Sequence, residues 1–128
     1  MDDLYRDEIL EHYRNPHNFG TLDEPTTVKE GANPLCGDRI TLMLGIDESG
    51  HVNDVKFTGR GCAISQASAS ILTSLIAGKL LVEVNQLTSG ELLEAIGIGA
   101  GSARVECALL SLRVLRVGLN GPDYIPDE

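Results

Sequence analysis

Basic residues are scarce in this sequence. Ten lysines and arginines stand against nineteen aspartates and glutamates, so the net charge is −9 at pH 7. Affinity for nucleic acid comes mainly from clustered basic side chains that neutralise phosphates. The composition therefore argues against nucleic acid as a partner, and it favours a soluble protein or one that docks on a basic surface.

Long hydrophobic runs are also missing. No stretch approaches the length of a membrane-spanning helix, and residues 1–14 are charged throughout, without the apolar centre of a secretory signal. We therefore expect no membrane association and a cytoplasmic location. The 128 residues, 42% hydrophobic and 23% charged, are enough for one domain with its own core.

Cysteine occurs only three times, as Cys36, Cys62 and Cys107. In a chain without an export signal, this number indicates thiols or metal ligands in a reducing compartment rather than a disulfide framework. No two of the cysteines are spaced as C-x-x-C, which excludes the zinc-finger patterns. A site that uses all three must be assembled from distant loops.

The hydrophobic pattern predicts strands followed by helices. Alternating apolar residues predict strands over 40–46 and 51–59, joined by a turn, and residues 26–31 are a candidate third strand. The alternation of the 51–59 strand is imperfect, which indicates a β-bulge. Helical spacing predicts helices over 3–14, 65–78, 80–87, 88–96 and 103–118. This order predicts an α+β fold, a small antiparallel sheet with helices packed on it.

The sequence predicts where one of these helices begins and ends, and which residues of another are exposed. Ser65 is the expected N-cap of the 65–78 helix, and Gly78 is its expected C-terminal stop. On the 103–118 helix, Glu106, Arg113 and Arg116 are spaced seven and three residues apart. This spacing predicts that the three side chains share a narrow exposed stripe.

Each cysteine lies at the predicted end of an element. Turn-forming residues on either side place Cys36 and Asp38 together on a loop tip. Cys62 falls where a strand ends and a helix begins, and Cys107 falls in the first turn of the last helix, where the helix dipole favours a thiolate over a thiol. Any one of them alone could be a small hydrophobic residue. Together, with a carboxylate beside one of them, they indicate a metal or sulfur site.

Four segments of the chain resemble a known family. In order they are LYRDEILEHYRNPHNFG, NPLCGDRI, GRGCAISQASASILTSLIAGK and ARVECALLSLRVL. Over residues 4–118 they resemble the IscU/SufU/NifU N-terminal family of iron–sulfur cluster assembly scaffolds. The resemblance implies an α+β fold with a three-stranded antiparallel sheet, and an iron–sulfur scaffold domain over residues 1–118. Residues 119–128 form the remaining C-terminal tail, which we interpret as solvated.

The resemblance also implies a cluster site made of Cys36, Asp38, Cys62 and Cys107. These residues match the family's three cluster cysteines and its loop aspartate. Three soft thiolates hold iron strongly, whereas one hard carboxylate completes the site weakly, so such a site is closed but labile. Cys36 and Cys107 are the candidate acceptors of a persulfide, because branches of the family differ on this point.

The chain departs from both branches of the family. ISC-type members have a histidine immediately before the third cysteine, where this chain has Glu106, and GAGSARVEC replaces their proline-containing chaperone motif. SUF-type members have an extra segment between the second and third cysteines that this chain lacks. We interpret Glu106 as a residue that stabilises the helix dipole rather than as a second oxygen ligand. His12 and His17 are interpreted as surface or packing residues.

Two functions follow from the resemblance. In the first, the chain is a non-enzymatic scaffold that assembles a [2Fe–2S] cluster from iron and sulfur and passes it to apoproteins, with a homo-oligomer around the cluster as one arrangement. In the second, the same thiolates and carboxylate bind Zn²⁺ and one thiolate accepts a persulfide, as in a zinc-dependent sulfurtransferase. Both imply a cysteine desulfurase of the IscS, NifS or SufS kind as partner. The missing segment favours the scaffold, and the link to desulfurases argues against a plain zinc-stabilised binding module.

Overall fold

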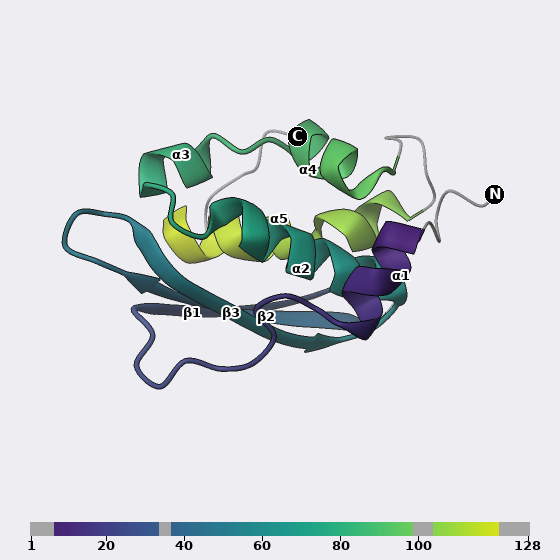
Figure 1. Cartoon of the computed structure of the whole chain (residues 1–128), viewed down its shortest axis with the longest axis horizontal. Helices are drawn as coiled ribbons and strands as arrows, with labels where there is room; N and C mark the ends of the chain where they lie inside the picture. The colour runs from purple at the N-terminus through teal and green to yellow at the C-terminus, as the bar shows by residue number, and fades with distance from the viewer. Residues whose placement is uncertain (1–6, 34–36, 99–103, 121–128) are drawn as a thin grey trace.

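One helix is followed by three strands and then by four helices in the computed structural model, which describes residues 7–33, 37–98 and 104–120 (Figure 1). The elements are α1 (Asp7–Arg14), β1 (Thr27–Asn33), β2 (Asp38–Ile46), β3 (Val52–Arg60), α2 (Ala63–Ile76), α3 (Leu81–Asn85), α4 (Ser89–Ile96) and α5 (Val105–Asn120). This order confirms the predicted α+β class. Within these residues, no helix has the length and apolar character needed to cross a membrane. The tail was predicted to comprise residues 119–128. Leu119 and Asn120 belong to α5 instead, and residues 121–128 lie outside the described part of the chain.

The strands form one antiparallel sheet in the order β1-β2-β3, as the resemblance implied. The candidate strand at 26–31 is β1. The pairing of β2 with β3 is irregular beside the hairpin, because Gly45 lies opposite Asp54 whereas Ile46 lies opposite Val52. The β-bulge predicted from the imperfect alternation is therefore confirmed.

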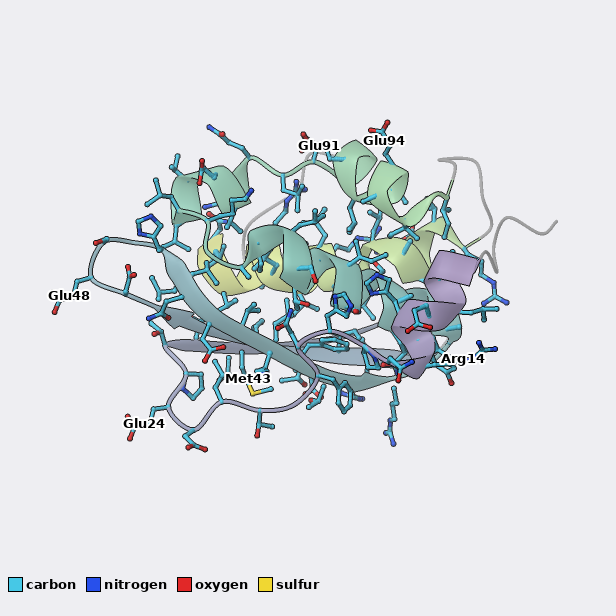
Figure 2. The ribbon with its side chains drawn as sticks, viewed as in Figure 1. Arg14, Glu24, Met43, Glu48, Glu91 and Glu94 are labelled. Carbon is cyan, nitrogen blue, oxygen red and sulfur yellow. The ribbon has the colours of Figure 1, made fainter. Side chains whose placement is uncertain are left out.

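The helices cover one face of the sheet (Figure 1). Alternate residues of β2, namely Ile40, Leu42 and Leu44, are at most 2% exposed and build the core on that face. Met43, from the other set, lies on the opposite face (Figure 2). The helix α2 is central, because α1, α4, α5 and the sheet all contact it. All four residues of its segment 67–70, alternating alanine and serine, are fully buried, and these small side chains let the neighbouring elements approach closely.

Histidines join α1 and the segment after it to α2. The Nδ1 atom of His12 lies 2.7 Å from Oγ of Ser70, and the backbone N–H of His17 donates to the same oxygen at 2.8 Å. Nδ1 of His17 lies 3.0 Å from Oγ of Ser74. The two imidazole rings also stand 4.6 Å apart. These contacts support the interpretation of both histidines as packing residues.

Ser65 is not the N-cap of α2, contrary to the prediction from the sequence. The helix begins at Ala63, and Cys62 occupies the N-cap position. The buried Ser65 hydroxyl instead donates to the carbonyl oxygen of Cys62 at 3.1 Å. The prediction was wrong because a serine in the first turn can bond to the cap residue behind it as well as cap the helix itself.

Arg116 does not share the exposed stripe predicted on α5. It is 4% exposed, and its guanidinium donates to the carbonyl oxygen of Leu87, in the connection between α3 and α4. Glu106 and Arg113 do lie at the surface, with side chains 52% and 43% exposed, and they form an ion pair at 2.5 Å. The spacing along α5 was sufficient to predict that Glu106 and Arg113 are exposed on the same side. The burial of Arg116 depends instead on the segment around Leu87, which packs against this helix.

The start of α4 offers a test of local stability. Oγ1 of Thr88 accepts the N–H of Glu91 at 3.1 Å, while Oε1 of Glu91 accepts the N–H of Thr88 at 2.9 Å. We expect Thr88→Ala to lower the free energy of unfolding by about 1 kcal/mol, because one N–H at the helix start loses its acceptor. Urea denaturation measures the change. Thr88→Ser retains the hydroxyl as the control, and equal losses in the two variants would contradict the prediction.

Candidate metal centre

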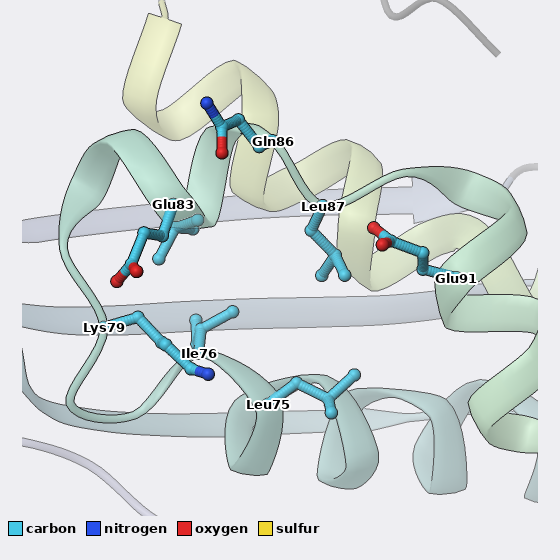
Figure 3. Close-up of a pocket in the computed structure, with 8 residues that line it drawn as sticks. Leu75, Ile76, Lys79, Glu83, Gln86, Leu87 and Glu91 are labelled. Carbon is cyan, nitrogen blue, oxygen red and sulfur yellow. The ribbon is translucent and has the colours of Figure 1, made fainter.

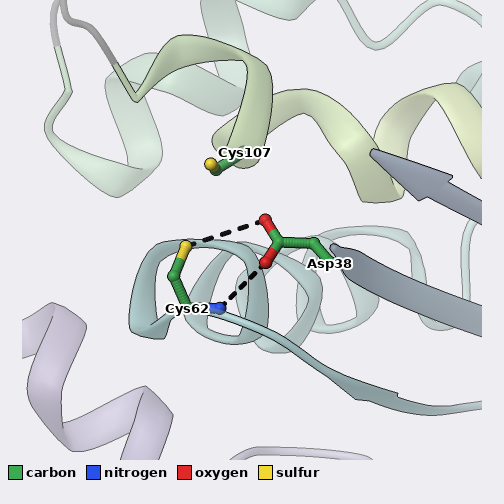
Figure 4. Close-up of side chains that lie close together, drawn as sticks. All are labelled: Asp38, Cys62 and Cys107. Atoms are coloured by element: carbon green, nitrogen blue, oxygen red, sulfur yellow. Dashed lines mark hydrogen bonds between the residues drawn. The ribbon is translucent and has the colours of Figure 1, made fainter. Parts of the chain in front are cut away.

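Three elements bring one acidic or thiol side chain each to the same place (Figure 4). Asp38 is the first residue of β2, Cys62 caps α2, and Cys107 lies in the first turn of α5. A carboxylate oxygen of Asp38 and the two sulfur atoms all lie within 4.8 Å of one another. The described part of the chain contains no other group of three or more His, Cys, Asp or Glu side chains with such spacing.

Asp38 is buried, whereas the turn-forming residues around it predict a loop tip. It is 1% exposed and pairs with Asn33 of β1, so the turn ends at Gly37 and the strand begins at the aspartate. Oδ1 accepts the backbone N–H of Cys62 at 3.0 Å, and Oδ2 accepts the Cys62 thiol at 3.8 Å (Figure 4). Among the described residues, no basic side chain pairs with this carboxylate. The described donors to this carboxylate are therefore the backbone N–H and the thiol of Cys62.

Gly61 makes the contact between Asp38 and α2 possible. Its φ is +141°, a conformation that residues with a side chain rarely adopt. A Cβ atom at this position would fall on Oδ1 of Asp38 and lie 2.7 Å from its Cγ. The glycine between β3 and α2 therefore leaves space for the carboxylate to reach the backbone N–H of Cys62.

The two cysteines both lie at helix N-termini but differ in exposure. Cys107 is 2% exposed and belongs to the hydrophobic core, whereas Cys62 is partly exposed. The first turns of α2 and α5 direct their positive ends to the same site. A helix N-terminus has backbone N–H groups without partners inside the helix, and at α2 the N–H of Cys62 donates to Asp38. This placement confirms the prediction that Cys62 and Cys107 stand at element ends.

Two other predicted residues have different outcomes. Cys36 lies outside the described residues, so its place as fourth ligand and as persulfide acceptor stays a prediction. Glu106 does not belong to the cluster, and its carboxylate is engaged by Arg113. This pairing supports the interpretation of Glu106 as a surface residue of the first turn of α5 rather than as a ligand.

The donor set fits a soft or borderline metal ion. Thiolate sulfur and carboxylate oxygen are both common ligands of Zn²⁺, and thiolates hold iron–sulfur clusters. Sulfur ligands at 2.3 Å around one tetrahedral ion stand about 3.8 Å apart. Donor atoms within 4.8 Å of one another thus need to contract only slightly to share an ion.

A hollow elsewhere on the protein lacks comparable chemistry. It has a volume of about 320 Å³ and lies between the end of α2, α3 and the start of α4 (Figure 3). Leu75 and Leu87 are among its apolar residues. Its two carboxylates, Glu83 and Glu91, accept the backbone N–H groups of Leu80 and Thr88. These acidic residues cap helices, so we assign the hollow no catalytic role.

Comparison with known proteins gives consistent results. The sequence pattern of the NifU-like N terminal domain matches residues 4–124. The chain is 37% identical to the zinc-dependent sulfurtransferase SufU of Bacillus subtilis, over 93% of this chain and 91% of that protein. It is 36% identical to the iron–sulfur cluster assembly scaffold protein IscU of Thermotoga maritima, over 91% and 92%. Among solved structures, the SUF-system protein FiSufU of Fervidobacterium islandicum has a TM-score of 0.80 at 28% identity and covers 91% of this chain and 97% of its own.

The space beside Asp38 can be tested with two glycines that have the same φ. Gly61 and Gly20 both have a φ of +141°, but a Cβ atom at Gly20 meets nothing within 4 Å. We expect Gly61→Ala to lower the free energy of unfolding by about 2 kcal/mol more than Gly20→Ala, because only the first displaces a buried carboxylate from its donor. Urea denaturation of both variants measures the difference. Equal losses of unfolding free energy in the two variants would mean that the positive φ alone explains the need for glycine at position 61.

Proposed function

The chain belongs to the family of NifU-like N-terminal domains, the scaffold family of iron–sulfur cluster assembly, and we propose that it is itself a non-enzymatic scaffold. Its cargo is a [2Fe–2S] cluster, which it assembles on Cys36, Asp38, Cys62 and Cys107. A cysteine desulfurase supplies the sulfur, and apoproteins receive the completed cluster.

The mixed donor set is the observation that carries this proposal. Cys62 and Cys107 offer soft sulfur, and Asp38 offers hard carboxylate oxygen. One of its two oxygens, Oδ1, also accepts a hydrogen bond from the backbone N–H of Cys62. Carboxylate oxygen is a poor match for iron in a sulfur-rich site. One weak ligand among strong ones suits a protein that must hold a cluster and then release it.

The burial of the three donors supports the same role. Asp38 and Cys107 are almost fully buried, so they shield one side of the site from water. Cys62 is partly exposed and marks the side on which iron and sulfur enter and the cluster leaves. Cys36 stands two residues before Asp38 in the sequence, within about 7 Å of chain, and completes the ligand set in this proposal.

Two observations favour a second function. Donor atoms within 4.8 Å of one another suit a single tetrahedral ion, and a relative at 37% identity is a zinc-dependent sulfurtransferase. When bound, Zn²⁺ would keep the coordinating thiols deprotonated. The Cys36 or Cys107 thiolate would then attack the outer sulfur of the desulfurase persulfide, forming a new S–S bond as the desulfurase thiolate leaves.

Anaerobic reconstitution distinguishes these functions and tests the cysteines. We expect the wild-type protein, incubated with iron, cysteine and a desulfurase, to develop the visible absorption of a [2Fe–2S] cluster. Cys36→Ser, Cys62→Ser and Cys107→Ser should each lose stable cluster while circular dichroism shows a folded domain, because serine replaces one sulfur atom at little cost in volume. A full-strength spectrum in any variant removes that residue from the site. A wild-type protein that retains stoichiometric zinc and forms no cluster would favour the sulfurtransferase.

The weak ligand can be tested through the rate of cluster release. Asp38→Cys should form a four-thiolate site that holds the cluster more tightly, so transfer to an apo-ferredoxin should slow by about tenfold or more. Glu106→Gln is the matched control at a carboxylate already engaged by Arg113, and it should transfer at the wild-type rate. Both rates are measured anaerobically at equal cluster loading. Equal rates for Asp38→Cys and wild type would show that Asp38 does not control release.

A further inference from the structure

The separation between the two thiols depends on how α2 and α5 pack. Cys62 immediately precedes α2 and Cys107 lies in the first turn of α5, and the chain passes through α3 and α4 between them. The two cysteines are 45 residues apart in sequence, so the distance between their sulfur atoms depends on how the two helices pack. Apolar packing alone is non-directional and leaves one helix some freedom to shift along the other.

A buried hydroxyl joins the two helices close to the thiols. Oγ of Ser68 donates to the carbonyl oxygen of Ala108 at 2.5 Å, across forty residues of sequence. Both residues are fully buried. Ala108 directly follows Cys107, and Ser68 lies six residues, less than two helical turns, after Cys62. The hydrogen bond therefore connects the backbone next to one thiol to the helix that carries the other.

The surroundings make this bond a strong positional constraint. A hydrogen bond has a preferred distance and angle, and it is strengthened where water is excluded. Ala108, which carries the acceptor, has a small side chain, and it is fully buried like Ser68. If the helices moved apart, the Ser68 hydroxyl would remain buried without an acceptor, which is costly.

Ser111 provides a contrast in the same helix. It is 1% exposed and lies one turn after Cys107 on α5. Its hydroxyl has no hydrogen-bond partner within the part of the chain that the structure describes. Ser68 and Ser111 are thus two buried serines of the helices that carry the thiols, and of the two only Ser68 joins α2 to α5.

We propose that Ser68 is a positioning residue which sets the separation of Cys62 and Cys107 through its hydrogen bond to Ala108. The role of this spacing in metal or cluster binding rests on the proposed function. The spacing itself does not, because the hydrogen bond joins protein atoms alone. Ser68 touches no reacting atom and acts by holding α5 in register with α2.

Chemical cross-linking of the thiols tests the spacing without any metal. In a Cys36→Ser background, Cys62 and Cys107 are the remaining thiols. Dibromobimane becomes fluorescent when both of its arms alkylate neighbouring thiols, with loss of two bromide ions and two protons. We expect Ser68→Ala to lower the yield of cross-linked protein at least threefold, and Ser111→Ala to leave it unchanged. Equal yields in all three proteins, or equal losses in both serine variants, would overturn the proposal.

Binding of Co²⁺ to the chain with all three cysteines gives an independent measurement. Ser68→Ala should weaken Co²⁺ affinity by about tenfold, the size expected for loss of a supporting contact, and should shift the sulfur-to-cobalt absorption bands. Ser111→Ala should keep the affinity, the bands and the thermal stability of the parent. Wild-type affinity and bands in Ser68→Ala would overturn the proposed positioning. A wild-type protein that binds neither Co²⁺ nor a cluster would overturn the proposed function, while the cross-linking result would still decide the role of Ser68.

Discussion

The contact between Asp38 and the backbone N–H of Cys62 joins the start of β2 to the start of α2. Through it, a buried carboxylate meets the positive end of the central helix, and the Cys62 thiol is held beside the same carboxylate. Gly61 is the condition for this contact, because a side chain there would occupy the space of the carboxylate. The candidate metal centre depends on this junction, since two of its three described donors belong to it.

The third donor depends on packing in the helical layer. Cys107 reaches the junction because α5 lies against α2 and the sheet, with small residues at the contact. Residues 67–70 of α2 alternate alanine and serine, and their small side chains allow other elements to pack on several sides of this helix. Its hydroxyls then bond outward, from Ser70 to α1 and the segment after it and from Ser68 to α5. The same segment therefore provides both close packing and directional bonds.

These features are consistent with a site that binds firmly and still releases its cargo. Cys107 and Asp38 are buried, so under the proposed function the protein would not need to order them before a cluster assembles. In the proposed scaffold function, the lability of the cluster comes instead from ligand chemistry, because a carboxylate oxygen competes poorly with sulfur for iron. A rigid framework with one weak bond to the metal can release a cluster without unfolding.

The sequence by itself determined the α+β order, the edges of most elements and the placement of Cys62 and Cys107 at helix starts. These features rest on local periodicity and end signals, which act over a few residues. Tertiary structure alone decided that Asp38 is buried and that Arg116 is covered by the connection after α3. Both depend on a contact with a segment distant in sequence. Neither can be read from spacing, because burial is a property of what folds over a residue.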